Sequence, residues 1–317
     1  MSNSSTTLDA SSWILHHYPQ SPVAQKVRFL LGLCGHPWWS VEIPRIPPKP
    51  LLMPLTANYR RTPVLQIGAD IYCDSQNIAH TLAERGHSSR VFGSQAPGAV
   101  MSLAAWVEQT VFALAVRLVI TDALDTAPSE FIQDRGDLYF GKGWTSDQLR
   151  QEQTSVALEL HGHLAYLESM LLTTPYLGGS TASLSDAAAA SVVWFLKARW
   201  SNGLACLAAF PRLVAVLDTL EGLSLHAVGD LRGEDALQIA SMSCTGTEPE
   251  LSDWASALGY TLGSTVRVRP AGESSDPDVI GSLRALSDLR ISLDHWDPQV
   301  GDVVVHFPLP GYRVELA

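Results

Sequence analysis

Two serine-containing motifs carry the chemistry that this sequence offers. Asp74-Ser75 is followed by apolar residues at the spacing of one helical face: Ile78, Ala79, Leu82 and Ala83. The pair therefore predicts the start of a helix. The first turn of a helix has unpaired backbone N–H groups, and together with the Ser75 hydroxyl these would bind a carboxylate. Ser21-Pro22 is a second helix start, with serine as N-cap and proline at the first helical position.

Short strand candidates precede both motifs. Trp13–Tyr18 comes before Ser21, and Val64–Ile67 comes before Asp74. Val64–Ile67 is followed by turn chemistry at 68–70 and by a further strand candidate, Ile71-Tyr72. The helix after Ser21 ends at Gly35, and Val41–Ile43 follows as a strand. This order of strand, helix, strand, proline-rich connection, hairpin and helix is that of a thioredoxin-like domain.

The layout from Arg61 to Arg85 resembles the glutathione-binding half of the glutathione S-transferase superfamily. The resemblance implies a cis peptide bond before Pro63 and implies that Thr62 pairs its backbone with the cysteinyl part of glutathione. It also implies that Asp74 and Ser75 bind the γ-glutamyl group. Arg61 stands where related enzymes often have a polar glutathione contact, although Arg60-Arg61 is equally interpretable as a solvated pair.

In this resemblance the Ser21 hydroxyl donates a hydrogen bond to the glutathione sulfur. A thiol has a pKa of about 8.5. A hydrogen bond to a charged acceptor contributes ~1.5–3 kcal/mol and a helix N-terminus ~0.3–1 kcal/mol, enough to lower that pKa by about one to three units. The structural alternative is that Ser21 only caps its helix. Tyr18 is the alternative donor, because other classes use a tyrosine at the end of the first strand.

The motif after Ser21 argues against disulfide chemistry. Ser-Pro-Val-Ala at 21–24 contains no cysteine, so dithiol redox chemistry and deglutathionylation through a protein thiol are disfavoured.

The middle of the chain predicts a helical bundle. Amphipathic helical patterns run from Leu103 to Leu118 and from Val156 to Leu172. A glycine-rich stretch then leads to Ser183 and Asp186, a capping-box variant with Asp for the usual Glu. Ala187–Lys197 is apolar on every side and predicts a buried central helix. This combination resembles the folding signature of the transferase helical domain.

The last ninety or so residues predict strands. Thr265–Arg269 alternates apolar and charged residues, and Asp302–Phe307 and Tyr312–Leu316 flank a turn at 308–311. Leu283–Leu293 is compatible with a helix or a strand. Asn58–Pro63, together with the residues around His306–Tyr312, resembles fungal glutathione S-transferase-like proteins that carry an appended C-terminal β-rich domain.

The predicted fold class is an α/β thioredoxin-like N-terminal domain, an all-α helical-bundle C-terminal domain and an additional small β-rich (α+β) domain. We expect a flexible tail at 1–11, a glutathione-binding domain at 12–88, a helical domain at 89–228 and an accessory domain at 229–317.

Composition argues against several classes of partner and indicates the compartment. The net charge of −11 argues against binding to a nucleic-acid backbone. Four cysteines without metal-type spacing fit a reducing, cytoplasmic compartment. No metal is expected, and Asp294–Asp297 is interpreted as a turn cluster. The longest apolar runs are shorter than the ~18 residues of a membrane span.

These observations predict a glutathione S-transferase-like enzyme that activates the glutathione thiolate for attack on a hydrophobic electrophile. The electrophile is expected between domains, near Tyr18, Trp106 and Trp200. The fungal resemblance implies a substrate from secondary metabolism, and the family implies a homodimer. One alternative is a glutathione-dependent cis–trans isomerase of a conjugated, polyketide-like metabolite. A second is a non-catalytic binding or regulatory protein.

Overall fold

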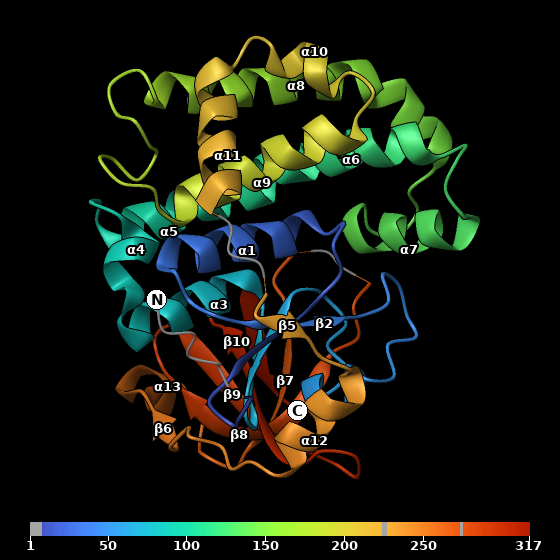
Figure 1. Ribbon diagram of the computed structural model, residues 1–317. Coiled ribbons are helices and arrows are strands. Elements are labelled where there is room, and N and C mark those ends of the chain that lie inside the picture. The colour runs from blue at the N-terminus through green and yellow to red at the C-terminus, as the bar shows by residue number, and fades with distance from the viewer. Residues whose placement is uncertain (1–7, 224–226, 273–274) are drawn as a thin grey trace. The chain divides into compact units, whose positions relative to one another are not determined.

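The computed structural model describes residues 8–223, 227–272 and 275–317 (Figure 1). Contacts group these residues into two compact units. The first contains the described residues up to 24, residues 37–78 and the described residues from 227 onward, and the second contains 25–36 and 79–223. The domain limits expected from the sequence stay a prediction. Residues 1–7 of the expected tail lie outside the described residues.

The first unit begins with the predicted thioredoxin-like order. Its strands are β1 (Trp13–His17), β2 (Trp39–Glu42), β3 (Val64–Ile67) and β4 (Asp70–Cys73). Helices α1 (Pro22–Cys34), α2 (Met53–Thr56) and α3 (Ser75–Leu82) connect or follow them. From residue 25 and residue 79 onward, α1 and α3 are grouped with the second unit. β1 pairs with β2 in parallel and with β3 antiparallel, and β3 pairs with β4 antiparallel. Asp70, expected in the turn, is instead the first residue of β4, because it pairs with Ile67.

The C-terminal segment continues the same sheet. Its main strands are β7 (Thr265–Pro270), β8 (Val279–Leu286), β9 (Arg290–Asp297), β10 (Gly301–Pro308) and β11 (Tyr312–Leu316). β10 lies parallel to β4, with Val304 opposite Asp70 and His306 opposite Tyr72. Within the described residues eleven strands form one sheet, in which β6 pairs with β8 off the order β11-β7-β8-β9-β10-β4-β3-β1-β2-β5 (Figure 1).

The first unit has one hydrophobic core to which both segments contribute. Val64 and Ile71 of the thioredoxin-like strands belong to the same cluster of buried residues as Leu293, Val305 and Phe307 of the C-terminal strands. Shorter elements of the segment are β5 (Gly229–Asp230), α12 (Gly233–Ser241), β6 (Glu250–Leu251) and α13 (Asp253–Ala257). The predicted fold class is confirmed, and its additional strands share a core with the thioredoxin-like strands.

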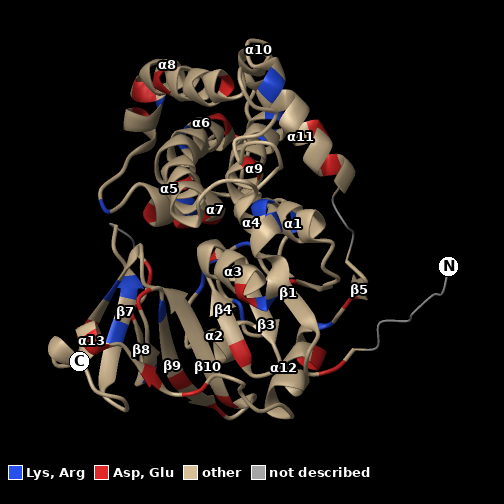
Figure 2. Ribbon diagram, turned by 90° about the vertical axis from the view of Figure 1, so that its left-hand side faces the viewer, with Lys and Arg blue, Asp and Glu red and all other residues tan. Residues whose placement is uncertain are grey.

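Charged pairs lie at the outer strands of this sheet. Figure 2 shows basic positions along β7, and two of them have acidic partners. Arg267 Nε lies 3.2 Å from Asp278, and Arg269 lies 2.8 Å from Glu315 on the neighbouring β11. The interpretation of Asp294–Asp297 as a turn was wrong. These residues end β9 and pair with β10, and the turn comes directly after them.

The second unit is helical. Its elements are η1 (Ala83–His87), α4 (Ser88–Phe92), α5 (Pro97–Trp106), η2 (Val107–Val111), α6 (Phe112–Ala123), α7 (Ser129–Tyr139), α8 (Ser146–Met170), α9 (Leu184–Arg199), α10 (Gly203–Leu207) and α11 (Pro211–Leu223). The capping box at Ser183 and Asp186 is present, and α9 is buried over most of its length, as predicted. The bundle is therefore organised around the helix that the sequence singled out.

Pro97–Ala123 is one continuous helical stretch of 27 residues, long and apolar enough to cross a membrane by length and composition alone. The core helix of a soluble protein meets the same test. Ala104, Ala115 and Leu118 are fully buried in this stretch, so one such helix is weak evidence for a membrane span.

Candidate functional site

The strand register brings three predicted site segments to one end of the sheet. Val64, the first residue of β3, lies opposite His16 near the end of β1 and opposite Cys73 at the end of β4. The segment that follows β1, the Thr62–Pro63 pair that precedes β3 and the Asp74–Ser75 pair that follows β4 therefore meet at this end.

Thr62 and Pro63 form the middle of the site. Their peptide bond is cis, as the resemblance implies. Among the described residues neither the backbone N–H nor the C=O of Thr62 makes a hydrogen bond, so both are available to an extended ligand. Lys49, which is buried, donates from Nζ to the Arg60 carbonyl at 2.8 Å and to Thr62 Oγ1 at 3.1 Å. Lys49 thus fixes the segment that leads into Pro63.

Asp74 and Ser75 form the second part of the site, at the start of α3. Asp74 has a φ of 74°, a left-handed conformation that is uncommon outside glycine and is concentrated at functional sites. Its Oδ1 accepts from the Gln76 N–H at 2.9 Å. Ser75 is the first residue of α3 and is buried. The helix start predicted from the sequence is present, and the Asp74 carboxylate accepts a hydrogen bond from its first turn.

Ser21 stands at the start of α1 with its hydroxyl partly committed. Its Oγ accepts from the Ala24 N–H at 3.1 Å, as an N-cap does. In the described part of the chain no acceptor takes the hydroxyl proton, so Ser21 keeps the capacity to donate while it caps the helix. Tyr18, the alternative donor, is 9% exposed, and its carbonyl accepts from the Ser21 N–H at 3.1 Å.

Arg61 is engaged by a residue that sequence reasoning did not consider. Asp276, in the loop between β7 and β8, accepts from Arg60 Nε at 2.9 Å and from Arg61 Nε at 2.5 Å. The Asp276 side chain is only 4% exposed, whereas that of Arg61 is 31% exposed. One buried carboxylate therefore binds both adjacent guanidinium groups.

Asp74 has a second partner, Tyr312 at the start of β11. The Tyr312 hydroxyl donates to Asp74 Oδ2 at 3.0 Å, and the Tyr59 hydroxyl lies 3.1 Å from that of Tyr312. Because Tyr312 gives its proton to a carboxylate, Tyr59 is the donor to Tyr312. Burial and then the Asp74 charge raise the pKa of both tyrosines well above 10. Both hydroxyls are therefore protonated donors at neutral pH.

Trp106 and Trp200, expected to bind the electrophile, belong to the second unit. Trp106 is half-buried and lies edge-to-face with His163 at 5.4 Å. Trp200 is 7% exposed, and its indole N–H is buried without a partner among the described residues.

Three further residues belong to the site in the first unit, and the sequence alone gave none of them a role there: Lys49, Asp276 and Tyr312. Lys49 lies in a proline-rich connection, and nothing in its spacing singles it out. Tyr312 belongs to the C-terminal pattern that resembles the fungal subfamily, and this pattern was its only indication of a role. No sequence pattern pointed to Asp276.

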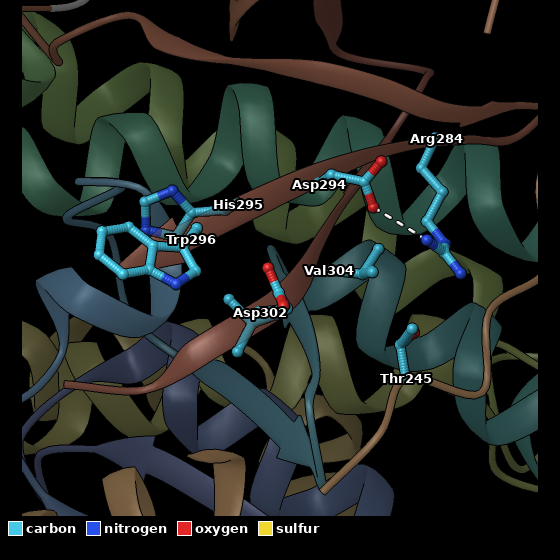
Figure 3. Close-up of a pocket in the computed structure, with 8 residues that line it drawn as sticks. Thr245, Arg284, Asp294, His295, Trp296, Asp302 and Val304 are labelled. Carbon is cyan, nitrogen blue, oxygen red and sulfur yellow. Dashed lines mark hydrogen bonds and ion pairs between the residues drawn. The ribbon is translucent and has the colours of Figure 1, made fainter. Parts of the chain in front are cut away.

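A pocket of about 430 Å³ lies on the C-terminal strands, away from the predicted residues (Figure 3). Arg284 of β8 and Asp294 of β9 lie next to each other in its lining and point toward one another, with 3.0 Å between Nη1 and Oδ1. Arg284 also donates to the Thr247 carbonyl, His295 contacts the Pro54 carbonyl and Thr245 donates to Asp70. Many polar side chains of the pocket lining are thus already hydrogen-bonded to other residues of the chain. No group of three or more metal-ligand side chains occurs among the described residues.

Two parts of the chain match known protein families. Residues 15–89 match the glutathione S-transferase N-terminal domain family, and residues 146–219 match the glutathione S-transferase C-terminal domain family. A crystal structure of a GST-like protein from Pseudomonas syringae is 31% identical, with a TM-score of 0.72, over 97% of this chain and 100% of that chain. The chain belongs to the glutathione S-transferase superfamily.

More distant structures share the fold. One is a glutathione transferase family member from Pseudomonas fluorescens with two glutathione bound, 12% identical over 70% of this chain and 96% of that chain, with a TM-score of 0.51. Poplar glutathione transferase F1 is 13% identical over 66% and 92% of the two chains, also at 0.51. No curated protein matches. The Pseudomonas syringae protein is bacterial, so the fungal resemblance stays a prediction.

Proposed function

We propose that this protein is a glutathione-dependent transferase that binds glutathione along the Thr62–Pro63 edge and activates its thiol beside Ser21. The observation that carries the proposal is the convergence of Ser21, Thr62 and the Asp74–Ser75 helix start at one end of the sheet. The unpaired backbone groups of Thr62 support antiparallel pairing with the cysteinyl part of the tripeptide.

Each end of glutathione has complementary chemistry in the proposal. The α3 N-terminus and Ser75 favour the γ-glutamyl carboxylate, and Asp74 attracts the γ-glutamyl ammonium. Ser21 donates to the sulfur and, with the α1 N-terminus, lowers the thiol pKa. The thiolate then forms a bond to an electrophilic carbon, and either a leaving group departs or a proton is added. Tyr18, Trp106 and Trp200 stay the proposed contacts of the hydrophobic substrate.

Two other functions use the same residues. In the isomerase alternative the thiolate adds to an enone, the bond rotates and glutathione is eliminated unchanged. One observation supports a non-catalytic protein: Asp276 already binds Arg61, a residue that the proposal places near glutathione. A fungal secondary metabolite as substrate, a cytoplasmic location and a homodimer also stay proposals, and sedimentation measures the last.

Calorimetric titration of glutathione into wild type and Ser75→Ala tests the binding site. Saturable binding that Ser75→Ala weakens is the expected result. The ultraviolet thiolate absorbance of the complex is then compared between wild type and Ser21→Ala, and its loss in Ser21→Ala is expected. Loss of glutathione during reaction with electrophiles distinguishes conjugation from isomerisation, in which glutathione is recovered.

Ser252→Ala is the matched control for Ser21→Ala. Ser252 caps α13 by accepting from the Ala255 N–H at 3.2 Å, the same geometry as Ser21 with Ala24. It should leave glutathione binding and the thiolate signal unchanged. Absence of binding at millimolar glutathione in wild type contradicts the proposed function.

A further inference from the structure

Two residues of the C-terminal segment bind the two sides of the proposed glutathione site. Asp276 accepts from Arg60 and Arg61, directly before Thr62. Tyr312 donates to Asp74, directly before Ser75. They are separated from their partners by more than 200 residues of sequence, so these contacts form only when the C-terminal strands are in place.

The contact at Asp74 orients the carboxylate without using up its acceptor sites. A carboxylate has about four lone-pair sites, and the described residues supply two donors: the Gln76 N–H to Oδ1 and the Tyr312 hydroxyl to Oδ2. One donor on each oxygen fixes the rotation of the group. Asp74 is only partly buried, so its remaining acceptor sites are open to a ligand.

The hydroxyl of Tyr312 is itself held in place. Tyr312 and Tyr59 are 9% and 4% exposed, and the Tyr59 hydroxyl donates to that of Tyr312. Phe307 packs against both rings, with centroids 5.5 Å from Tyr59 and 5.6 Å from Tyr312. The donor to Asp74 therefore comes from a packed group with little freedom to move.

We propose that Tyr312 is a positioning residue of the γ-glutamyl subsite, which holds the Asp74 carboxylate in the orientation that binds the ligand's ammonium group. The inference rests on the proposed function. It assigns the C-terminal strands a role in ligand recognition, because the residue that orients Asp74 is supplied by β11.

Tyr312→Phe removes the hydroxyl and keeps the ring. Its effect is measured by titration with glutathione and with an analogue in which the γ-glutamyl ammonium is replaced by hydrogen. We expect Tyr312→Phe to weaken glutathione about three- to ten-fold, less than the ten-fold or more of a direct hydrogen bond to a charged group, because Tyr312 acts on the ligand only through Asp74. The analogue should be weakened much less. A loss of general fold stability would weaken both ligands equally.

Tyr260→Phe is the matched control. The Tyr260 hydroxyl donates to the Val314 carbonyl on the same β11 strand at 2.7 Å, so its removal also costs a hydrogen bond there without touching Asp74. Both ligands should bind this variant as they bind wild type. Tyr59→Phe, which leaves the Tyr312–Asp74 contact in place, should give a smaller loss of the same selectivity and serves if Tyr312→Phe does not fold.

The outcomes separate the two proposals. If wild type binds no glutathione, the proposed function fails and this inference with it. If wild type binds and Tyr312→Phe binds both ligands unchanged, more tightly, or equally weakly, the positioning role is wrong while the proposed function stands.

Discussion

His306 on β10 lies with its Nε2 3.1 Å from Oδ1 of Asp70 on β4, at the line where the C-terminal strands join the thioredoxin-like strands. Three other groups donate to the same carboxylate: the Thr245 and Thr247 hydroxyls at 2.6 and 2.8 Å and the Gly246 N–H at 2.7 Å. The Ser292 hydroxyl lies 2.8 Å from His306 Nδ1. One buried carboxylate thus joins β4, β10 and the 245–247 loop.

Asp70 should make the stability of the chain sensitive to acid. Burial alone would raise its pKa, but hydrogen bonds from His306, Thr245 and Gly246 outweigh burial and lower the pKa from 3.8 to about 2. Because the folded pKa is depressed, the stabilisation is present above pH 3.8 and is lost as the pH falls toward 2. It is about 2 kcal/mol. Urea unfolding of wild type and Asp70→Asn between pH 2 and 7 should show a difference that shrinks over this interval.

Asp302→Asn is the control for this series, since Asp302 is an exposed carboxylate of β10 that makes no hydrogen bond with the described residues. A pH-independent difference between wild type and Asp70→Asn would contradict the assignment. The comparison with a variant is needed because burial raises the pKa of Asp186. That group favours the folded state most when protonated and so acts in the opposite direction.

Asp186→Ala should destabilise the chain more than loss of an ordinary cap. The buried carboxylate accepts from the backbone N–H groups of Leu177, Gly178 and Ser183 and from the Ser183 hydroxyl. Its removal leaves several buried donors unpaired, at about 1–3 kcal/mol each. Thr145→Ala, which removes only the exposed cap of α8, should cost about 1 kcal/mol. Equal losses in thermal unfolding would show that the buried network adds nothing.

Replacing each of two helical glycines by alanine should change the free energy of unfolding in opposite directions. Glycine in a helix costs about 1 kcal/mol relative to alanine. A Cβ on Gly162 in α8 would meet open space, so Gly162→Ala should raise the free energy of unfolding. A Cβ on Gly136 in α7 would overlap the Trp144 indole, so Gly136→Ala should lower it despite the better propensity. Urea denaturation of the two variants measures the signs, and stabilisation by Gly136→Ala would mean that Trp144 moves aside freely.

Lys49→Met should weaken glutathione binding through the Thr62 segment. Lys49 Nζ holds the Arg60 carbonyl and Thr62 Oγ1, and a methionine of similar length has no donor for either. We expect an affinity loss of about five-fold or more, the effect of losing hydrogen bonds from a charged donor. Lys142→Met, a change at an exposed lysine, should leave the titration unchanged. An unaltered affinity in Lys49→Met would show that the segment keeps its shape without the lysine.

Local signals in the sequence predicted most of the elements. Ser21-Pro22 marked the start of α1, and the Ser183–Asp186 pair marked the start of α9. Each depends on a few neighbouring residues, because a helix cap satisfies backbone groups within one turn. The alternating pattern at 265–269 likewise gave β7. The end of β9 was missed because Asp294–Asp297 is polar and partly exposed at the edge of a hairpin.

The contacts that complete the site could not be predicted in this way. Tyr312 and Asp74 are 238 residues apart, and Asp276 and Arg61 are 215 apart. No periodicity or cap connects positions so distant, and their meeting depends on the parallel pairing of β10 with β4. The sequence predicted that β10 would form. Its neighbour in the sheet was not encoded in any local pattern.

The β4–β10 pairing has a consequence for handling the protein in pieces. A sheet edge presents unpaired N–H and C=O groups that recruit strands from other molecules. In a fragment that ends before the C-terminal strands, β4 would become such an edge, and its apolar residue Ile71 would lose Val305 as a neighbour. The thioredoxin-like segment expressed alone should therefore self-associate. In the whole chain, the C-terminal strands cover this edge and so prevent aggregation through it.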